Sequence, residues 1–327
     1  MSLRLRRLLV ALAGATSLLL VTAGMVSPSS GMDEKGHFPR QALQTETPQP
    51  SEATPTVPVA GWNPPSLPVP LARHPYDHYW LIRPVASSYV NYGLSWYSYG
   101  SDGPANDLRI HHGIDIPNPV GVEVRAAGDG TVVVADHGFV NELETIGAYG
   151  NVVAIQHDFG YRGQAVYTLY AHLSTILVEV GNHVQTGQII GLIGATGLVS
   201  GPHVHFEVRV GRNGYYYVRN PELWIVPYAG TGVIAGRLQF ADGSTAHDVD
   251  ITVLDPLSGQ TVYTTTSYAG FGINADDNWN ENFVIPDVPV GRYVVMATYG
   301  ATTWLGEVVV REGMTNWVEM LQPDSEG

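Results

Sequence analysis

The sequence predicts an all-β fold, in which a domain built on an antiparallel sheet with an open groove is followed by a small β-sandwich. Glycine and proline are frequent, at 37 and 22 of 327 residues, and the apolar runs between them are short. This pattern is typical of strands joined by turns rather than of long helices. A hydrophobic content of 44% is sufficient for packed cores, and a chain of this length suggests about two domains.

The N-terminal 72 residues differ from the rest of the chain. Three arginines within the first seven residues precede an apolar run from Leu8 to Val26, which is the order of charged and hydrophobic regions in an export signal. Residues 1–26 are therefore predicted to be a signal peptide, with a retained membrane anchor as the alternative. Residues 27–72 are polar and rich in proline, so we expect a disordered linker and a secreted or cell-envelope protein.

The composition argues against several classes of function. The formal charge of −14 is unfavourable for a nucleic-acid-binding surface. The absence of cysteine excludes disulfides, a thiol nucleophile and zinc sites with cysteine ligands. Thr196 and Gly197 end a glycine-rich stretch, but no lysine accompanies them as a phosphate-binding loop would require. We therefore expect neither nucleic acid nor nucleotide as a partner, and we expect a monomer.

Residues 73–229 form the first predicted domain. Four short strands are expected before residue 175, at residues 122–124, 131–134, 151–157 and 166–172. We interpret Gly128 to Gly130 as a hairpin turn between the first two of these strands. Residues 137–149 are interpreted as an inserted loop, either bordering the groove or lying idle on the surface.

A further strand, predicted to begin at His203, alternates polar and apolar residues. Because side chains on a strand point to opposite faces in turn, His203, His205 and Glu207 would share one face. The apolar residues between them would face the core. Two imidazoles at this spacing can reach one metal ion, or one can bind metal while the other acts on substrate; two hydrogen-bonded histidines without metal are the alternative.

Two other histidines extend this polar cluster. His111 and Asp115 are four residues apart, and His172 ends an apolar strand-like run. Two histidines and one aspartate are a common ligand set for zinc, and three protein ligands leave the fourth position open for water, as in catalytic sites. The spacing does not decide whether His203 or His205 is the second histidine ligand. Glu207 could orient a ligand histidine or face solvent.

Residues 111–210 resemble the lysostaphin-type family of zinc metallopeptidases, which cut peptide bridges in bacterial peptidoglycan. The likeness is carried by three motifs, His111-x-x-x-Asp115, Tyr170-Ala171-His172 and Gly201-Pro202-His203-Val204-His205-Phe206-Glu207.

This resemblance implies zinc held by His111, Asp115 and His205, with His172 and His203 as the catalytic proton carriers and oxyanion partners. Zinc in such a site activates a water molecule for attack on a peptide carbonyl. The implied substrate is peptidoglycan peptide. All five family positions are filled, which favours an active enzyme; the alternative is a catalytically silent cell-wall-binding or regulatory protein that uses the same groove.

The remaining histidines and aromatic residues receive structural interpretations. The stretch from Tyr89 to Tyr99 is dense in aromatic rings, which we assign to the core in preference to a groove wall. Four histidines are expected at the surface or at the edge of the core, namely His112, His137, His157 and His183. His74 and His78 are expected outside the metal site.

Residues 230–322 show a different sequence pattern, in which short segments of alternating polar and apolar residues are separated by turn residues. This pattern is typical of an antiparallel sandwich. This region resembles the transthyretin-like, carboxypeptidase-regulatory type of β-sandwich, chiefly through the stretch from Ile285 to Tyr293. The sequence leaves open whether this region binds wall polymer or serves only to space and stabilise the protein.

Overall fold

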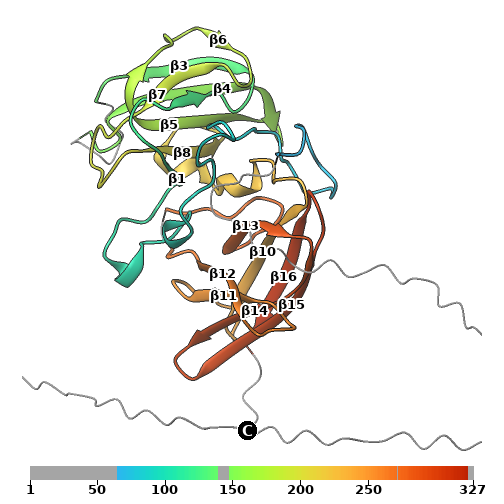
Figure 1. Ribbon diagram of the computed structural model, residues 1–327. Helices are drawn as coiled ribbons and strands as arrows, with labels where there is room; N and C mark the ends of the chain where they lie inside the picture. The colour runs from blue at the N-terminus through green and yellow to red at the C-terminus, as the bar shows by residue number, and fades with distance from the viewer. Residues whose placement is uncertain (1–64, 139–146, 271, 323–327) are drawn as a thin grey trace, which may run out of the picture. The chain divides into compact units, whose positions relative to one another are not determined.

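The computed structural model describes residues 65–138, 147–270 and 272–322. The predicted signal peptide or anchor, most of the predicted linker and much of the loop predicted at 137–149 lie outside these ranges. Among the described residues, no helix has the length and apolar character needed to span a membrane. The regular elements of the described residues are strands apart from four short 3₁₀ helices (Figure 1), which confirms the predicted all-β fold.

Residues 65–72 differ from the prediction of a disordered linker. The Leu67 amide donates to the Pro227 carbonyl at 3.1 Å, and Leu71 exchanges two backbone hydrogen bonds with Tyr79. The side chains of Leu67, Val69 and Leu71 pack against the main core. The apolar residues between the prolines thus bury enough surface to order this stretch, so the expectation that ordered structure begins at Arg73 was wrong.

Within the described ranges, the first sheet has nine strands, and every pairing in it is antiparallel. The neighbouring strands along its main path are β1-β8-β5-β4-β3-β6. The other three strands lie off this path: β7 pairs with both β2 and β5, and β9 pairs with β8. The strands are β1 (Ile114–Pro117), β2 (Glu123–Arg125), β3 (Gly130–Asp136), β4 (Asn151–Tyr161), β5 (Gln164–Ile176), β6 (His183–Val184), β7 (Ile189–Ile193), β8 (His203–Val210) and β9 (Val218–Arg219).

The turn predicted at Gly128–Gly130 does not join paired strands. β2 pairs with β7, whereas β3 pairs with β4 and β6. A Cβ atom on Gly130 would lie 2.3 Å from the carbonyl oxygen of Gln156 on β4. This glycine therefore permits a close approach of two strands. In the sequence, a glycine that serves this purpose looks the same as a glycine in a turn.

The C-terminal module, by which we mean residues 230–322, contains two sheets. One has the order β13-β10-β16 and the other β12-β11-β14-β15. Their strands are β10 (Thr231–Gln239), β11 (Asp250–Leu254), β12 (Thr261–Thr266), β13 (Phe283–Pro289), β14 (Gly291–Tyr299), β15 (Thr302–Val310) and β16 (Thr315–Leu321). The pair β10 and β16 is parallel, a departure from the expected antiparallel sandwich that lets the last strand return beside the first.

Both sheets of the C-terminal module bury side chains in one shared core, which includes Ile234 and Phe283 from one sheet and Val253 and Trp304 from the other. Two sheets that share one core agree with the predicted sandwich, whose assignment stays a prediction. The likeness to transthyretin-like domains stays a prediction. Four short 3₁₀ helices complete the described elements: η1 (Ser95–Tyr97), η2 (Pro104–Asn106), η3 (Tyr215–Tyr217) and η4 (Pro221–Leu223).

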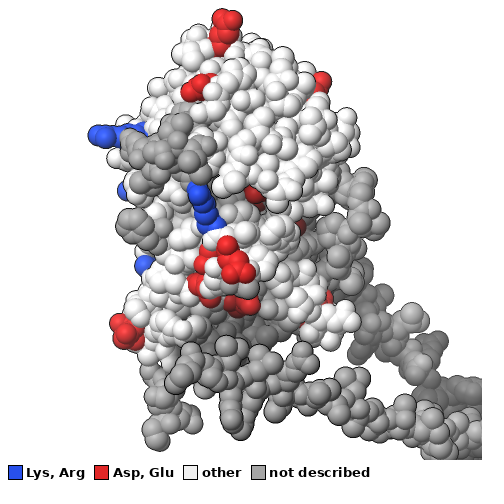
Figure 2. All heavy atoms as spheres, turned by 90° about the vertical axis from the view of Figure 1, so that its left-hand side faces the viewer, with Lys and Arg blue, Asp and Glu red and all other residues white. Residues whose placement is uncertain are grey.

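The core beneath the first sheet continues into the C-terminal module. Val233, Ala235 and Val284 of the module belong to the same buried cluster as Leu81 and Trp224. On the face drawn in Figure 2, charged side chains are sparse and much of the surface is uncharged, in keeping with a charged content of 14%.

Candidate metal centre

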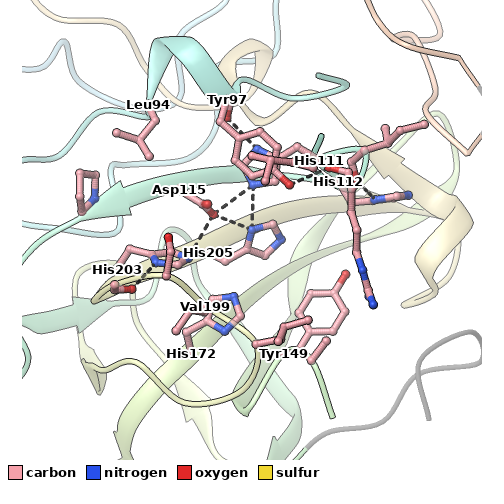
Figure 3. Close-up of a pocket in the computed structure, with 18 of the residues that line it drawn as sticks. Leu94, Tyr97, His111, His112, Asp115, Tyr149, His172, Val199, His203 and His205 are labelled. Atoms are coloured by element: carbon pink, nitrogen blue, oxygen red, sulfur yellow. Dashed lines mark hydrogen bonds and ion pairs between the residues drawn. The ribbon is translucent and has the colours of Figure 1, made fainter. Parts of the chain in front are cut away.

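Three side chains that are distant in the sequence converge at one end of β1 and β8. His111 precedes β1, Asp115 lies within β1, and the backbone register pairs Asp115 with His205 of β8. Asp115 Oδ1 lies 3.0 Å from His111 Nε2 and 2.8 Å from His205 Nδ1, and the two imidazole nitrogens are 3.1 Å apart (Figure 3). All three side chains are buried.

These atoms fit the geometry of a tetrahedral zinc site. A zinc ion with bonds of about 2.0–2.1 Å separates its ligand atoms by roughly 3.3 Å. The observed separations of 2.8, 3.0 and 3.1 Å therefore need only a small expansion. The same three residues line a cavity of about 730 Å³, so a fourth position could be reached from the cavity.

The far side of each histidine is held by a hydrogen bond. His111 Nδ1 lies 2.8 Å from the carbonyl oxygen of Tyr97, to which it donates, and the Tyr97 ring stacks on the imidazole with centroids 4.0 Å apart. His205 Nε2 lies 3.0 Å from Glu207 Oε1. These hydrogen bonds orient the rings so that His111 Nε2 and His205 Nδ1 face the cluster, where they would bind a metal ion.

Glu207 is completely buried rather than facing solvent. Besides contacting His205, it accepts a hydrogen bond from the Tyr149 hydroxyl and lies 2.6 Å from Arg209 Nε. Burial alone would raise the pKa of Glu207, but the Arg209 charge and the His205 hydrogen bond lower it below its usual range. The ionised carboxylate therefore orients His205, and of the two roles considered for Glu207 only this one agrees with its position.

The electrostatics favour a charged cluster. Burial would raise the pKa of Asp115, yet His111 and His205 hold it well below its usual range. Burial would lower the pKa of His205, but hydrogen bonds with Asp115 and Glu207 raise it to about 9. A metal ion bound at His205 Nδ1 therefore displaces a proton.

His172 and His203 lie beside the three converging residues. Their ring centroids are 4.7 Å apart, and His203 Nε2 is 3.5 Å from Asp115 Oδ1. Each Nδ1 atom donates to a carbonyl oxygen at 2.9 Å, that of Thr196 for His172 and that of Gly201 for His203. Each Nε2 atom is consequently the basic nitrogen.

Burial lowers the pKa of both of these imidazoles, and that of His172 falls to about 3. His172 also has a backbone φ of 62°, a left-handed conformation that costs about 1–3 kcal/mol in a residue with a Cβ and that is enriched at functional sites. It lies where the β5 pairing is irregular, and such a bulge redirects a side chain that regular pleating would point elsewhere.

Aromatic and apolar side chains line the cavity around these histidines. Trp96 and Tyr97 belong to the stretch that we assigned to the core, yet both line the cavity, whereas Tyr99 is buried as expected. Leu198 and Val199 also contribute to the lining. The groove-wall alternative therefore applies to part of the aromatic stretch. Tyr149, at the end of the predicted inserted loop, lines the cavity as well.

Two of the four histidines expected at the surface or at the edge of the core are buried. His112 is 5% exposed and its ring lies against Tyr215 with centroids 3.8 Å apart. His157 is 4% exposed and its Nε2 lies 2.9 Å from the Thr168 hydroxyl. Each contacts a neighbour that is not adjacent in sequence, Tyr215 for His112 and Thr168 for His157, and a local pattern does not reveal such contacts. His137 and His183 are exposed.

His74 and His78 do not belong to the converging group. His78 Nε2 lies 3.1 Å from Asp276 Oδ2 in a buried pair. Sequence reasoning missed Tyr97, whose carbonyl holds His111, because backbone contacts across 14 residues leave no motif.

Residues 109–217 match the model described as peptidase family M23. The chain carries an M23 peptidase domain. This confirms the family resemblance predicted from the three motifs, because the matched residues contain all of them.

The M23 domain is similar to several curated proteins. The chain is 42% identical over 102 residues to the DD-carboxypeptidase/endopeptidase Mpg of Neisseria meningitidis, covering 31% of this chain and 20% of the relative. It is 44% identical over 101 residues to the peptidoglycan DD-endopeptidase ShyA of Vibrio cholerae, covering 31% and 20%. It is 35% identical over 134 residues to the glycyl-glycine endopeptidase ALE-1 of Staphylococcus capitis, covering 39% and 33%.

The chain thus spans about a fifth of the length of the first two relatives. Among solved structures, the catalytic domain of lysostaphin from Staphylococcus simulans is 29% identical, with 40% of this chain and 91% of that chain covered and a TM-score of 0.34.

Proposed function

We propose that this protein is an exported, zinc-dependent endopeptidase that hydrolyses peptide cross-bridges of bacterial peptidoglycan. The observation that carries the proposal is the convergence of His111, Asp115 and His205, with ligand atoms 2.8–3.1 Å apart, on a cavity that His172 and His203 also line. Membership of the domain in family M23 supports it. Relatives named as peptidoglycan endopeptidases support the substrate class.

In this proposal His111 Nε2, Asp115 Oδ1 and His205 Nδ1 hold the zinc ion. The ion would supply Lewis acidity, lowering the pKa of a water molecule and polarising the peptide carbonyl. Proton transfer and charge stabilisation would come from the protein's own residues. The basic Nε2 atoms of His172 and His203 accept a proton or donate one to the departing amine, and when protonated they stabilise negative charge on the carbonyl oxygen.

The apolar and aromatic lining of the cavity suits a peptide main chain with small side chains. Trp96, Leu198 and Val199 offer contact area without charge, while Asp107 and Arg109 add charged groups to the lining, so that binding would depend on shape together with a few polar contacts. An N-terminal export signal would bring the enzyme to its substrate, because peptidoglycan lies outside the cytoplasm.

The proposal is tested by dye release from purified cell walls, with and without a chelator, followed by mass spectrometry of the released muropeptides. We expect chelator-sensitive release and new amino termini within peptide stems or bridges, with the glycan strands uncut. His203→Ala should abolish release, whereas His183→Ala, an exposed histidine paired with Asp158, should not.

Freed reducing sugars would overturn the proposed chemistry. Stoichiometric zinc binding without any lysis would instead favour a silent wall-binding protein. The masses of the fragments also identify the bond that is cut, whether a D,D-cross-link or a glycyl-glycine bridge.

A further inference from the structure

One ligand of the candidate metal centre is held by a segment that the C-terminal module supports. The segment comprises residues 97–101, which we call the bracing segment. Besides the Tyr97 contacts described above, Gly100 N donates to His111 O at 2.8 Å and His111 N donates to Ser101 O at 2.9 Å. The backbone and the imidazole of His111 are therefore both fixed by this one short stretch.

The bracing segment in turn lies against Thr265, Tyr268, Ala269 and Asn274 of the C-terminal module. The Ala269 amide donates to the Gly100 carbonyl at 2.8 Å. The Tyr99 hydroxyl donates to the Asn274 carbonyl at 3.0 Å and accepts from the Asn274 amide at 3.1 Å. Thr265 and Ser98 bring their hydroxyl oxygens within 3.3 Å of each other.

Packing reinforces these hydrogen bonds. Tyr99 is 1% exposed and meets the ring of Tyr268 edge-on, with centroids 5.2 Å apart. Gly100 has a φ of 80°, and a Cβ atom there would lie 2.6 Å from the Tyr268 ring. Because Tyr268 is also buried, the bracing segment packs tightly against the module at this point.

From these contacts we infer that the C-terminal module is a positioning element of the metal centre, acting through Tyr99 and the bracing segment on His111. The inference rests on the proposed function, because it concerns the affinity of that site for zinc. It assigns the module a role within the active site, beyond those of a spacer or a wall-binding domain. It also explains why Tyr97, on the same segment, can serve both as wall of the cavity and as partner of His111.

The variant Tyr99→Phe removes only the hydroxyl that joins the bracing segment to Asn274. A hydrogen bond of this kind corresponds to roughly a five- to tenfold change in an equilibrium constant, and a buried group left without a partner to more. We expect zinc affinity, measured by competition with a chromophoric chelator at fixed pH on the full chain, to fall about tenfold. Thr265→Val, which alters the module alone, should lower it less but in the same direction.

The matched control is Tyr293→Phe. Tyr293 is 2% exposed, and its hydroxyl donates to the Pro289 carbonyl at 3.0 Å within the C-terminal module. This variant also removes a tyrosine hydroxyl, one that makes a single hydrogen bond, so the unfolding free energy should fall by less than in Tyr99→Phe while zinc affinity stays at the wild-type value. Urea unfolding of all variants measures these losses of stability separately from zinc affinity.

Weaker zinc binding in Tyr99→Phe and Thr265→Val, but not in the control, supports the inference. The inference is overturned if zinc affinity is unchanged in Tyr99→Phe and Thr265→Val, or if Tyr293→Phe weakens zinc binding as much as they do. Either result leaves the proposed function intact. A wild-type protein that binds no zinc would count against the proposed function itself, and the two failures are therefore distinguishable.

Discussion

The buried carboxylate of Glu207 offers a way to separate metal binding from fold stability. It lies 3.0 Å from His205 Nε2 and 2.6 Å from Arg209 Nε. The variant Glu207→Leu removes the acceptor that orients His205 and also leaves Arg209, which is 1% exposed, without its partner charge. One change thus perturbs two properties whose sizes can be estimated independently.

For stability, an unpaired buried charge costs about 3–5 kcal/mol, whereas replacing both members of a buried pair by apolar residues is often close to neutral. For metal binding, loss of the group that orients a ligand histidine lowers affinity about 10–100-fold. We therefore expect Glu207→Leu to lose both stability and zinc affinity. The double variant Glu207→Leu/Arg209→Met should recover most of the stability but not the affinity.

The assays are urea unfolding of the metal-free protein and chelator competition for zinc. Glu207→Gln serves as the conservative control, because its amide oxygen can still accept from His205 Nε2 and it should bind zinc within about tenfold of the wild type. A folded double variant that binds zinc as tightly as the wild type would refute the reasoning, since His205 would then need no orienting carboxylate.

Three further predictions concern other parts of the molecule. His172→Asn keeps a residue that tolerates the left-handed backbone, so peptidase activity in dye release should fall about 10²–10⁴-fold while the melting temperature changes little; retained activity would contradict its role. Burial, aided by Asp287 and opposed by Arg83, raises the pKa of Glu222 from 4.5 to about 7. The folded state therefore keeps a proton that the unfolded chain releases, and this stabilisation is full below about pH 4.5 and is lost as the pH rises through 7. Glu222→Gln should flatten that dependence and gain on the order of 3 kcal/mol at pH 8 in urea unfolding; equal slopes for both proteins would disprove it. Asp287→Ala leaves the buried Arg83, 2.6 Å away, without its partner and should cost about 3–5 kcal/mol, measured in the same way; a loss below about 1 kcal/mol would show that Arg83 is solvated.

Periodic patterns in the sequence were sufficient for the elements that make the site. The alternation from His203 to Val208 predicted a strand with one polar face, and β8 has that face turned to Asp115. Short runs separated by glycine predicted the strands that became β2 to β5. These inferences hold because the side-chain alternation of a strand is a local property, fixed by backbone geometry.

Local patterns failed where a residue's role depends on remote partners. Gly130 looked like part of a hairpin turn, but its position is set by the carbonyl of Gln156. His157 was expected at the surface or at the edge of the core, but it is 4% exposed and bonds to Thr168 inside the protein. The stretch 65–72 looked like linker, but its leucines find an apolar surface on which to pack.

The sequence by itself determined the set of chemical groups, namely four histidines, one aspartate and the glutamate beside them, and the strands that carry most of them. Only the tertiary structure decided which histidine nitrogen faces which neighbour, because that depends on carbonyl groups contributed by Tyr97, Thr196 and Gly201. Only it revealed that the C-terminal module supports the segment holding His111. Contacts of this kind depend on the packing of distant segments, and backbone groups are identical in every residue, so the sequence carries no signal for them.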